Sequence, residues 1–159
     1  SLSNDACKLF GIEKPRVAVA GLNPHSGENG MFGSEEIDEI TPAIEEANSM
    51  GIITEGPVPA DTLFSKLNGR LYDIAVAMYH DQGHIPMKLM GFNFATGDNK
   101  ALTMKGVNIT LGLPIVRSSV DHGTAFDIAG QGIANQESML QAVEYGAMLS
   151  KNKCSDWRG

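Results

Sequence analysis

The sequence predicts an α/β protein with a mostly parallel sheet, and two observations carry this prediction. Two short apolar segments typical of buried strands, 17–22 and 74–78, each run into a polar loop that contains glycine. Segments with apolar residues at helical spacing are interleaved with them. Because such sheets bind ligands beyond the carboxyl ends of their strands, these two loops are the first places to search for a site.

Composition limits the function classes. The 159 residues suffice for one domain with a core or for a portion of a larger protein, and the formal net charge is −7. This charge argues against nucleic-acid and anionic-membrane partners, which require a basic face. No apolar run approaches the roughly 20 residues of a membrane span. Cys7 and Cys154 lack a C-x-x-C spacing, and we expect a reduced, cytoplasmic protein.

The first half of the chain is predicted in three parts. Residues 1–15 form a linker or the tail of a helix. A helix begins near Ser34 and ends at Gly51, with an apolar face made of Ile37, Ile40, Ile44 and Ala47. Two prolines then keep residues 57–59 out of helix and strand interiors, so Asp61 lies on a rigid loop or caps a short helix over 62–66.

The second half begins with a polar segment, 91–105, that we interpret as an excursion such as a hairpin. Residues 107–111 and 113–117 are the next strand candidates, separated by Gly112. A turn over 119–124 enters a helix at about 125–129. A final helix runs from Gln136 to about Ser150 and leaves 151–159 as a polar tail.

The two strand-end loops hold the candidate metal ligands, His25 and His80. Neutral imidazole is the commonest transition-metal ligand, although a loop histidine can also be a surface or capping residue. Asp81 follows His80 directly, and we expect Asp61 and Asp81 to orient ligands or transfer protons. The first loop has the glycine spacing G-x-x-G-x-x-G, which is neither a dinucleotide nor a Walker A fingerprint.

Other polar residues allow two interpretations each. Lys88, Asn108 and Arg117 lie at the edges of apolar segments and form a candidate anion site or are ordinary surface groups. His84 would share a helix face with His80, but Gly83 and Pro86 argue against that helix and favour a structural role. The pair Asp121-His122 is a turn-stabilising pair or an acid–base pair, and we favour the first.

Five segments in this order resemble the 4-hydroxythreonine-4-phosphate dehydrogenase family. They are LNPHSGE (22–28), PVPADT (57–62), MYHDQG (78–83), GVNITLGLP (106–114) and VDHGTA (120–125). The resemblance implies the isocitrate/isopropylmalate dehydrogenase-like fold, a three-layer α/β/α arrangement. It also implies a homodimer with a shared active site that uses NAD and a divalent metal such as zinc, magnesium or cobalt.

The resemblance assigns roles to residues through these motifs. His25 and His80 match metal ligands, whereas Lys88, Asn108 and Arg117 match substrate-binding positions. The implied reaction is the NAD-dependent oxidation and decarboxylation of 4-hydroxythreonine 4-phosphate in pyridoxal 5'-phosphate biosynthesis. The family's third metal histidine and a His-Thr substrate pair belong to an upstream region, so residues 16–150 resemble only the C-terminal portion.

Two alternatives stay open. Residues 92–105 form a longer segment than expected in the biosynthetic enzymes, which points to relatives that oxidise D-threonate or D-erythronate 4-phosphate. The chain could also be a non-catalytic, dimerising fragment that binds metal or phosphate.

Overall fold

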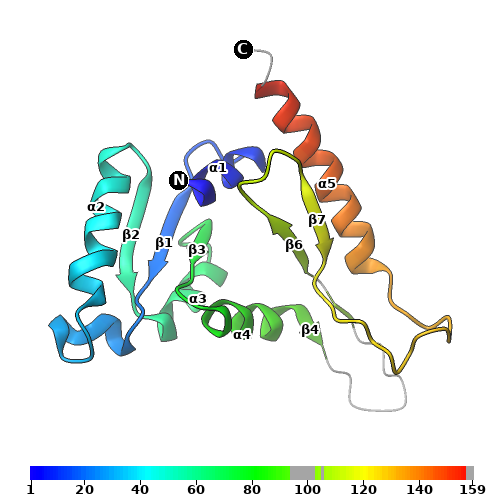
Figure 1. Ribbon diagram of the computed structural model, residues 1–159, viewed down its shortest axis with the longest axis horizontal. Helices are drawn as coiled ribbons and strands as arrows, with labels where there is room; N and C mark the ends of the chain where they lie inside the picture. Colours follow the sequence, from blue (N-terminus) through cyan, green and yellow to red (C-terminus); the bar gives the residue numbers. More distant parts are fainter. Residues whose placement is uncertain (94–102, 105, 157–159) are drawn as a thin grey trace. The chain divides into compact units, whose positions relative to one another are not determined.

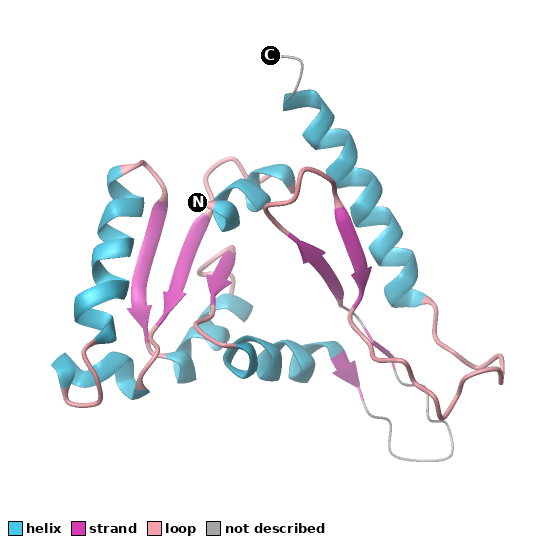
Figure 2. Ribbon diagram, viewed as in Figure 1, coloured by secondary structure: helices cyan, strands magenta, loops and turns pink. Residues whose placement is uncertain are grey.

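The computed structural model describes residues 1–93, 103–104 and 106–156. The chain divides into two compact units, Ser1–Pro86 (unit 1) and Met87–Gly159 (unit 2) (Figure 1). Unit 1 is built on a parallel sheet and unit 2 on an antiparallel hairpin. The arrows of β1 and β2 accordingly point the same way in Figure 2, whereas those of β6 and β7 are opposed.

Unit 1 alternates helices with strands, as predicted. Its three strands have the order β2-β1-β3, and β1 is parallel to both neighbours. In chain order the elements are α1 (Leu2–Leu9), β1 (Arg16–Ala20), η1 (Pro24–Gly30), η2 (Glu36–Ile40), α2 (Thr41–Ser49), β2 (Ile53–Val58), α3 (Ala60–Asn68), β3 (Ile74–Val76) and the start of α4 (His80–Gly91).

The side chains of strand β1 alternate between the two faces of the sheet in unit 1. Ala18 and Ala20 are fully buried on one face, where Leu63 of α3 completes the core together with Val58 and Tyr72. Val17 and Val19 alternate to the other face, toward α1 and α2. Helices therefore cover both faces, and the predicted α/β architecture with a parallel sheet is confirmed.

The two predicted helices of unit 1 differ from expectation in detail. The segment after Ser34 begins with the π-helical turn η2 and becomes α-helical only at Thr41, one residue before Pro42. Gly51 ends the helix as predicted, with a φ of +81° that suits glycine. Asp61 lies in the first turn of α3, which is longer than the predicted helix.

Unit 2 contains two short antiparallel pairs and one long helix. The first pair joins β4 (Phe92–Asn93) to β5 (Thr103–Met104), so the predicted hairpin is confirmed where it is described; residues 94–102 and 105 lie outside the described part. The second pair joins β6 (Val107–Thr110) to β7 (Arg117–Val120). Helix α5 (Glu137–Asp156) packs on this hairpin through Ser138, Ala142 and Leu149.

Three predictions for unit 2 are wrong. Residues 113–117 do not form a strand: β7 begins only at Arg117, and the carbonyls of Leu113 and Pro114 accept hydrogen bonds from Lys153 Nζ instead. No helix forms over 125–129, where Ala125 has a φ of +47° and residues 126–130 form turns. Helix α5 does not end near Ser150 but continues to Asp156.

Candidate functional site

Three of the predicted site residues follow the three parallel strands of unit 1. His25 lies in η1 after β1, Asp61 in α3 after β2, and His80 at the start of α4 after β3. Since parallel strands have their carboxyl ends at one edge of the sheet, this edge carries all three (Figure 1). The fold thus places them on neighbouring loops, as the sequence predicted for the two histidines.

Gln82 links the loops that bear the two histidines, and our sequence analysis did not identify it. Its side chain is buried; Nε2 donates to the carbonyl of Gly21 at 2.8 Å, and Oε1 accepts from the backbone N–H of Met78 at 2.7 Å. Gly21 leads into the loop of His25, and Met78 leads to His80. The sequence signal for this role was the position of Gln82, a polar residue between His80 and Gly83.

The loop that holds His25 has an uncommon backbone. Residues 25–29 all have positive φ, from 41° at Glu28 to 80° at Gly27. L-residues adopt this left-handed region at a cost of roughly 1–2 kcal/mol each. Gly27 has a second reason to be glycine, because a Cβ there would lie 2.7 Å from Oε2 of Glu36. Ser26 Oγ anchors the loop to the carbonyl of Pro57 at 3.1 Å.

Glu36 supports this loop from inside the protein. It is only 3% exposed and accepts hydrogen bonds from the backbone N–H (2.7 Å) and Nδ2 (2.9 Å) of Asn23. Burial acts to raise the pKa of Glu36, but the hydrogen bonds outweigh it and the pKa is lowered. The sequence did not predict this buried role, because Asn23 and Glu36 are 13 positions apart and no spacing rule links them.

Both predicted metal ligands have one ring nitrogen occupied by a carboxylate. His25 Nδ1 lies 2.5 Å from Glu28 Oε1, and His80 Nδ1 lies 2.8 Å from Asp81 Oδ1. A metal-ligating histidine usually donates its other N–H to such a group, so this donor set fits a divalent metal at Nε2. Among the described residues, however, no three His, Cys, Asp or Glu side chains form a metal site.

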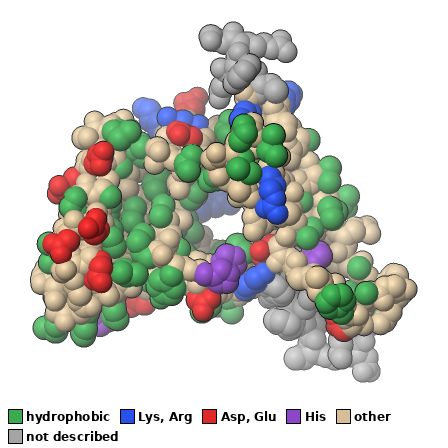
Figure 3. Space-filling model, in the orientation of Figure 1, with side chains coloured by type: hydrophobic (Ala, Val, Ile, Leu, Met, Phe, Trp, Pro, Cys, Tyr) green, Lys and Arg blue, Asp and Glu red, His purple; other side chains and the backbone are tan. Residues whose placement is uncertain are grey.

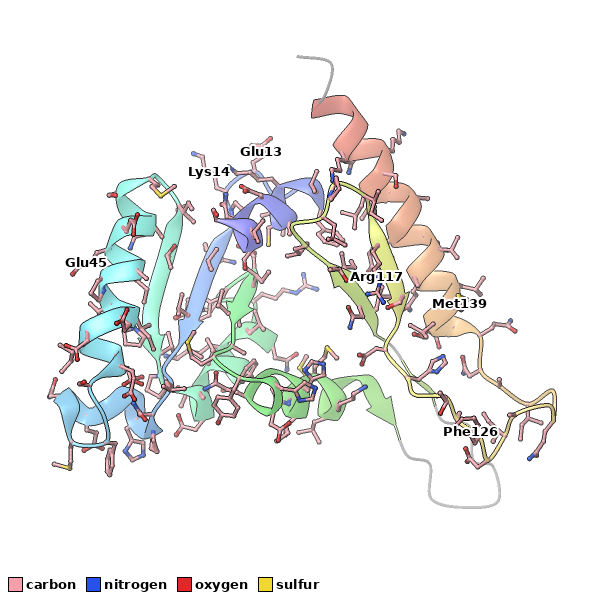
Figure 4. All side chains as sticks on the ribbon, in the orientation of Figure 1. Glu13, Lys14, Glu45, Arg117, Phe126 and Met139 are labelled. Atoms are coloured by element: carbon pink, nitrogen blue, oxygen red, sulfur yellow. The ribbon has the colours of Figure 1, made fainter. Side chains whose placement is uncertain are left out.

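Unit 2 carries the three residues of the predicted anion site. Asn108 pairs with Ser119 and Arg117 with Thr110 across the β6–β7 hairpin, so all four side chains share one face. The opposite face carries Ser118, which lies against Gly146 of α5. Arg117, labelled in Figure 4, donates to Thr110 Oγ1 at 2.8 Å. The hairpin therefore brings Asn108 and Arg117 together.

Lys88 is held at the end of β7. Its Nζ donates to the carbonyl oxygen of Asp121 at 2.6 Å and to Oδ2 at 2.7 Å, and the Asp121 side chain is only 11% exposed. His122 Nδ1 lies 2.9 Å from the carbonyl of Gly123. Asp121 and His122 thus contact different groups: Asp121 binds a lysine 33 positions away, whereas the His122 contact lies within the turn.

Other features of unit 1 lie apart from these residues. A cavity of about 440 Å³ opens beside α1 and α2 and is lined mainly by apolar side chains, including Val17, Ile44 and Val76, but by none of the predicted site residues. Acidic side chains gather over α2, where Glu45 is exposed (Figures 3 and 4). Burial and the nearby Asp73 raise the pKa of the Cys7 thiol, which disfavours the thiolate.

Comparison with known families decides the identity of the fold. Residues 1–146 match the model of the family described as "Pyridoxal phosphate biosynthetic protein PdxA". The chain belongs to the PdxA family. Among the described residues, no helix has the length and apolar character needed to cross a membrane.

Named relatives in the PdxA family carry two different activities. The chain is 56% identical over 149 residues to a putative D-threonate 4-phosphate dehydrogenase of Bradyrhizobium diazoefficiens, covering 94% of this chain and 43% of the relative. It is 52% identical to a 4-hydroxythreonine-4-phosphate dehydrogenase of Desulforapulum autotrophicum, covering 93% and 41%.

A solved structure agrees with the PdxA assignment. The crystal structure of 4-hydroxythreonine-4-phosphate dehydrogenase from Klebsiella pneumoniae superposes on this chain with a TM-score of 0.75 at 47% identity. The match covers 93% of this chain and 41% of the Klebsiella pneumoniae chain. The chain thus spans about two fifths of the length of the relatives it matches. The resemblance found in the sequence is confirmed, as is its partial extent.

Proposed function

We propose that this chain is the C-terminal portion of an NAD- and divalent-metal-dependent dehydrogenase. The proposed substrate is 4-hydroxythreonine 4-phosphate, oxidised and decarboxylated in pyridoxal 5'-phosphate biosynthesis. The observation that carries the proposal is the placement of His25 and His80 after adjacent parallel strands, each with Nδ1 against a carboxylate. This arrangement supports a role for both Nε2 atoms in holding the metal.

The remaining predicted residues have proposed roles of their own. Asp81 orients the His80 ring through its 2.8 Å contact, and Asp61, exposed at the start of α3, is the candidate for proton transfer. Lys88, Asn108 and Arg117 bind the phosphate or carboxylate of the substrate and offset its negative charge. When bound, a divalent ion would polarise the substrate hydroxyl and NAD would supply the hydride-accepting ring.

A second substrate, D-threonate 4-phosphate, is favoured by a specific observation. The relative at 56% identity is named as a putative D-threonate 4-phosphate dehydrogenase, and an enzyme of Cupriavidus necator at 51% identity is named as a D-threonate 4-phosphate dehydrogenase. Both candidate substrates are phosphorylated hydroxy acids, so the same anion residues would serve either one. Titrating each compound into the chain with Zn²⁺ present, by calorimetry, ranks the two.

The role of Arg117 provides a direct test. Arg117→Lys keeps the charge but removes the planar fork, so we expect substrate binding to weaken by roughly 1–3 kcal/mol. The matched control is Arg70→Lys, an exposed arginine in unit 1. Calorimetry on both variants measures the change. Equal affinity of Arg117→Lys and the unaltered chain for both substrates would remove Arg117 from the proposed site.

We also propose that the chain forms a homodimer whose metal site both subunits share, and that the chain alone turns over no substrate. The described residues supply only two histidines to the proposed site. Light scattering at several concentrations measures association, and NADH absorbance measures turnover. A strictly monomeric chain contradicts the shared site, whereas NADH formation above background contradicts the need for a further ligand.

A further inference from the structure

The first turn of α4 carries a stacked pair of histidines. Gly83 and Pro86 argued against a helix here, but α4 runs unbroken from His80 to Gly91. His80 and His84 therefore lie one turn apart on the same face. Their rings are 4.0 Å apart between centroids and nearly parallel, with an interplanar angle of 6°.

Hydrogen bonds define the protonated nitrogen of each ring. His84 Nδ1 contacts the backbone carbonyl of His80 at 3.2 Å, and His80 Nδ1 contacts the Asp81 carboxylate at 2.8 Å. A carbonyl and a carboxylate only accept hydrogen bonds, so each Nδ1 carries the proton. The lone pair of each neutral ring is then on Nε2, the nitrogen that faces away from these contacts.

The stacking separates the roles of the two rings. A metal ligated by imidazole lies near the plane of that ring, because the nitrogen lone pair lies in the plane. Two nearly parallel rings whose centroids are 4.0 Å apart do not share one ion unless a ring rotates. In this arrangement His84 presents its face to His80, and its nitrogen is not directed to the same ion as that of His80.

We propose that His84 is a positioning residue that holds the His80 imidazole for metal binding. This inference rests on the proposed function, in which His80 is a metal ligand. The His80 side chain is 76% exposed, so few packing contacts restrict its rotation. The ring face of His84 on one side and the Asp81 carboxylate at Nδ1 together fix the ring before the metal arrives, which lowers the entropic cost of binding.

The test uses the whole chain and titration with ZnCl₂, followed by calorimetry. His84→Phe keeps an aromatic face without a nitrogen, and His84→Ala removes the face. Alanine is the best helix former, so the second variant does not weaken α4 through helix propensity. Ile85→Ala, at an exposed position next to His84, is the matched control. Circular dichroism confirms that each variant is folded.

We expect His84→Ala to weaken Zn²⁺ binding by about 3- to 10-fold, the size of one aromatic contact, with unchanged stoichiometry. His84→Phe should bind within about 2-fold of the unaltered chain, as should Ile85→Ala. Equal affinity of His84→Ala and the unaltered chain would overturn the inference. So would an equal loss in His84→Phe and His84→Ala, because that result would make His84 a ligand through its nitrogen.

A second measurement separates this inference from the proposed function. His80→Ala should abolish the binding event that His84→Ala weakens. If His80→Ala leaves Zn²⁺ binding unchanged, the proposed metal site itself fails. Long-range ¹H–¹⁵N spectra of the histidine rings add a readout independent of affinity: with Zn²⁺ bound, the Nε2 resonance of His80 should shift and that of His84 should not.

Discussion

Unit 1 and unit 2 hold their predicted site residues on different kinds of support. In unit 1 the residues follow parallel strands, and backbone hydrogen bonds such as Gly21 N–H to the Val58 carbonyl (2.9 Å) fix the loops beside a buried core. In unit 2 Lys88 of α4 binds Asp121 at the end of β7, and Asn108 and Arg117 lie on a hairpin backed by one helix. The outer side of that helix exposes Met139, Leu140 and Val143, and Met139 is labelled in Figure 4.

The two units therefore differ in what their side chains contribute: the core of unit 1 contributes mainly to stability, and the cations of unit 2 contribute mainly to the proposed binding of substrate. In unit 1 the backbone hydrogen bonds of the sheet and buried side chains such as Gln82 and Glu36 together hold the polar strand ends. Unit 2 holds its cations by side-chain pairs such as Lys88 with Asp121. We therefore expect core substitutions to matter in unit 1 and to matter little on the outer face of α5.

The largest expected effect tests that comparison directly. Leu63→Ala empties a site with no solvent exposure in the core of unit 1 and should cost about 2–5 kcal/mol. Leu140→Ala, 55% exposed on α5, should change stability by about 0.5 kcal/mol or less. Hydrogen exchange read by mass spectrometry, with peptides from each unit analysed separately, measures both. Similar costs for the two variants would break the comparison.

Gln82 gives the next largest effect. Gln82→Leu leaves the Gly21 carbonyl and the Met78 N–H without their buried partner and should cost about 1–3 kcal/mol in total. Gln131 in unit 2 is the matched control, since its side chain also donates to a carbonyl, that of Asp127, but in an exposed loop. Urea unfolding should show a loss only for Gln82→Leu. Parallel losses in both variants would deny Gln82 its linking role.

Tyr72 gives the smallest effect and a pH dependence. Burial, together with the 2.7 Å hydrogen bond to Glu55, raises its pKa to about 12 from 10.0. The folded pKa is the higher one, so the stabilisation is complete below pH 10 and is lost as the pH rises from 10 to 12. Tyr72→Phe should cost about 1 kcal/mol at neutral pH.

Absorbance titration of the tyrosines checks this pKa. The component that disappears in Tyr72→Phe should titrate near pH 12, whereas the exposed Tyr79 supplies the control variant, Tyr79→Phe. A Tyr72 component with a midpoint near pH 10 would mean that neither burial nor the bond to Glu55 raises the pKa of Tyr72.

Sequence patterns predicted the parts of this fold that depend on local chemistry. The continuous apolar runs 17–22 and 74–78 predict buried strands without any alternation of polar and apolar residues, and both contain strands of the sheet. The positions of His25, Asp61 and His80 after strands followed from this. The strand predicted over 113–117 failed because Pro114 and the contacts of Lys153 outweigh its apolar composition.

Long-range partners could not be predicted in the same way. Glu36 contacts Asn23, and Lys88 contacts Asp121, which is 33 positions away along the chain. No spacing rule links such pairs, because only the folded backbone brings them together. The helix through Gly83 and Pro86 was missed for another reason: the rule against proline in a helix interior is a preference, and α4 continues through Pro86.

The run of positive φ angles at residues 25–29 has a consequence for chirality. Coded L-residues other than glycine fit this region poorly, whereas their mirror images fit it without steric cost. A chain made by chemical ligation with D-asparagine at position 29, an exposed residue with a φ of 55°, would keep the same backbone path with less strain. The backbone of the loop that presents His25 thus has φ angles that suit D-amino acids better than L-amino acids.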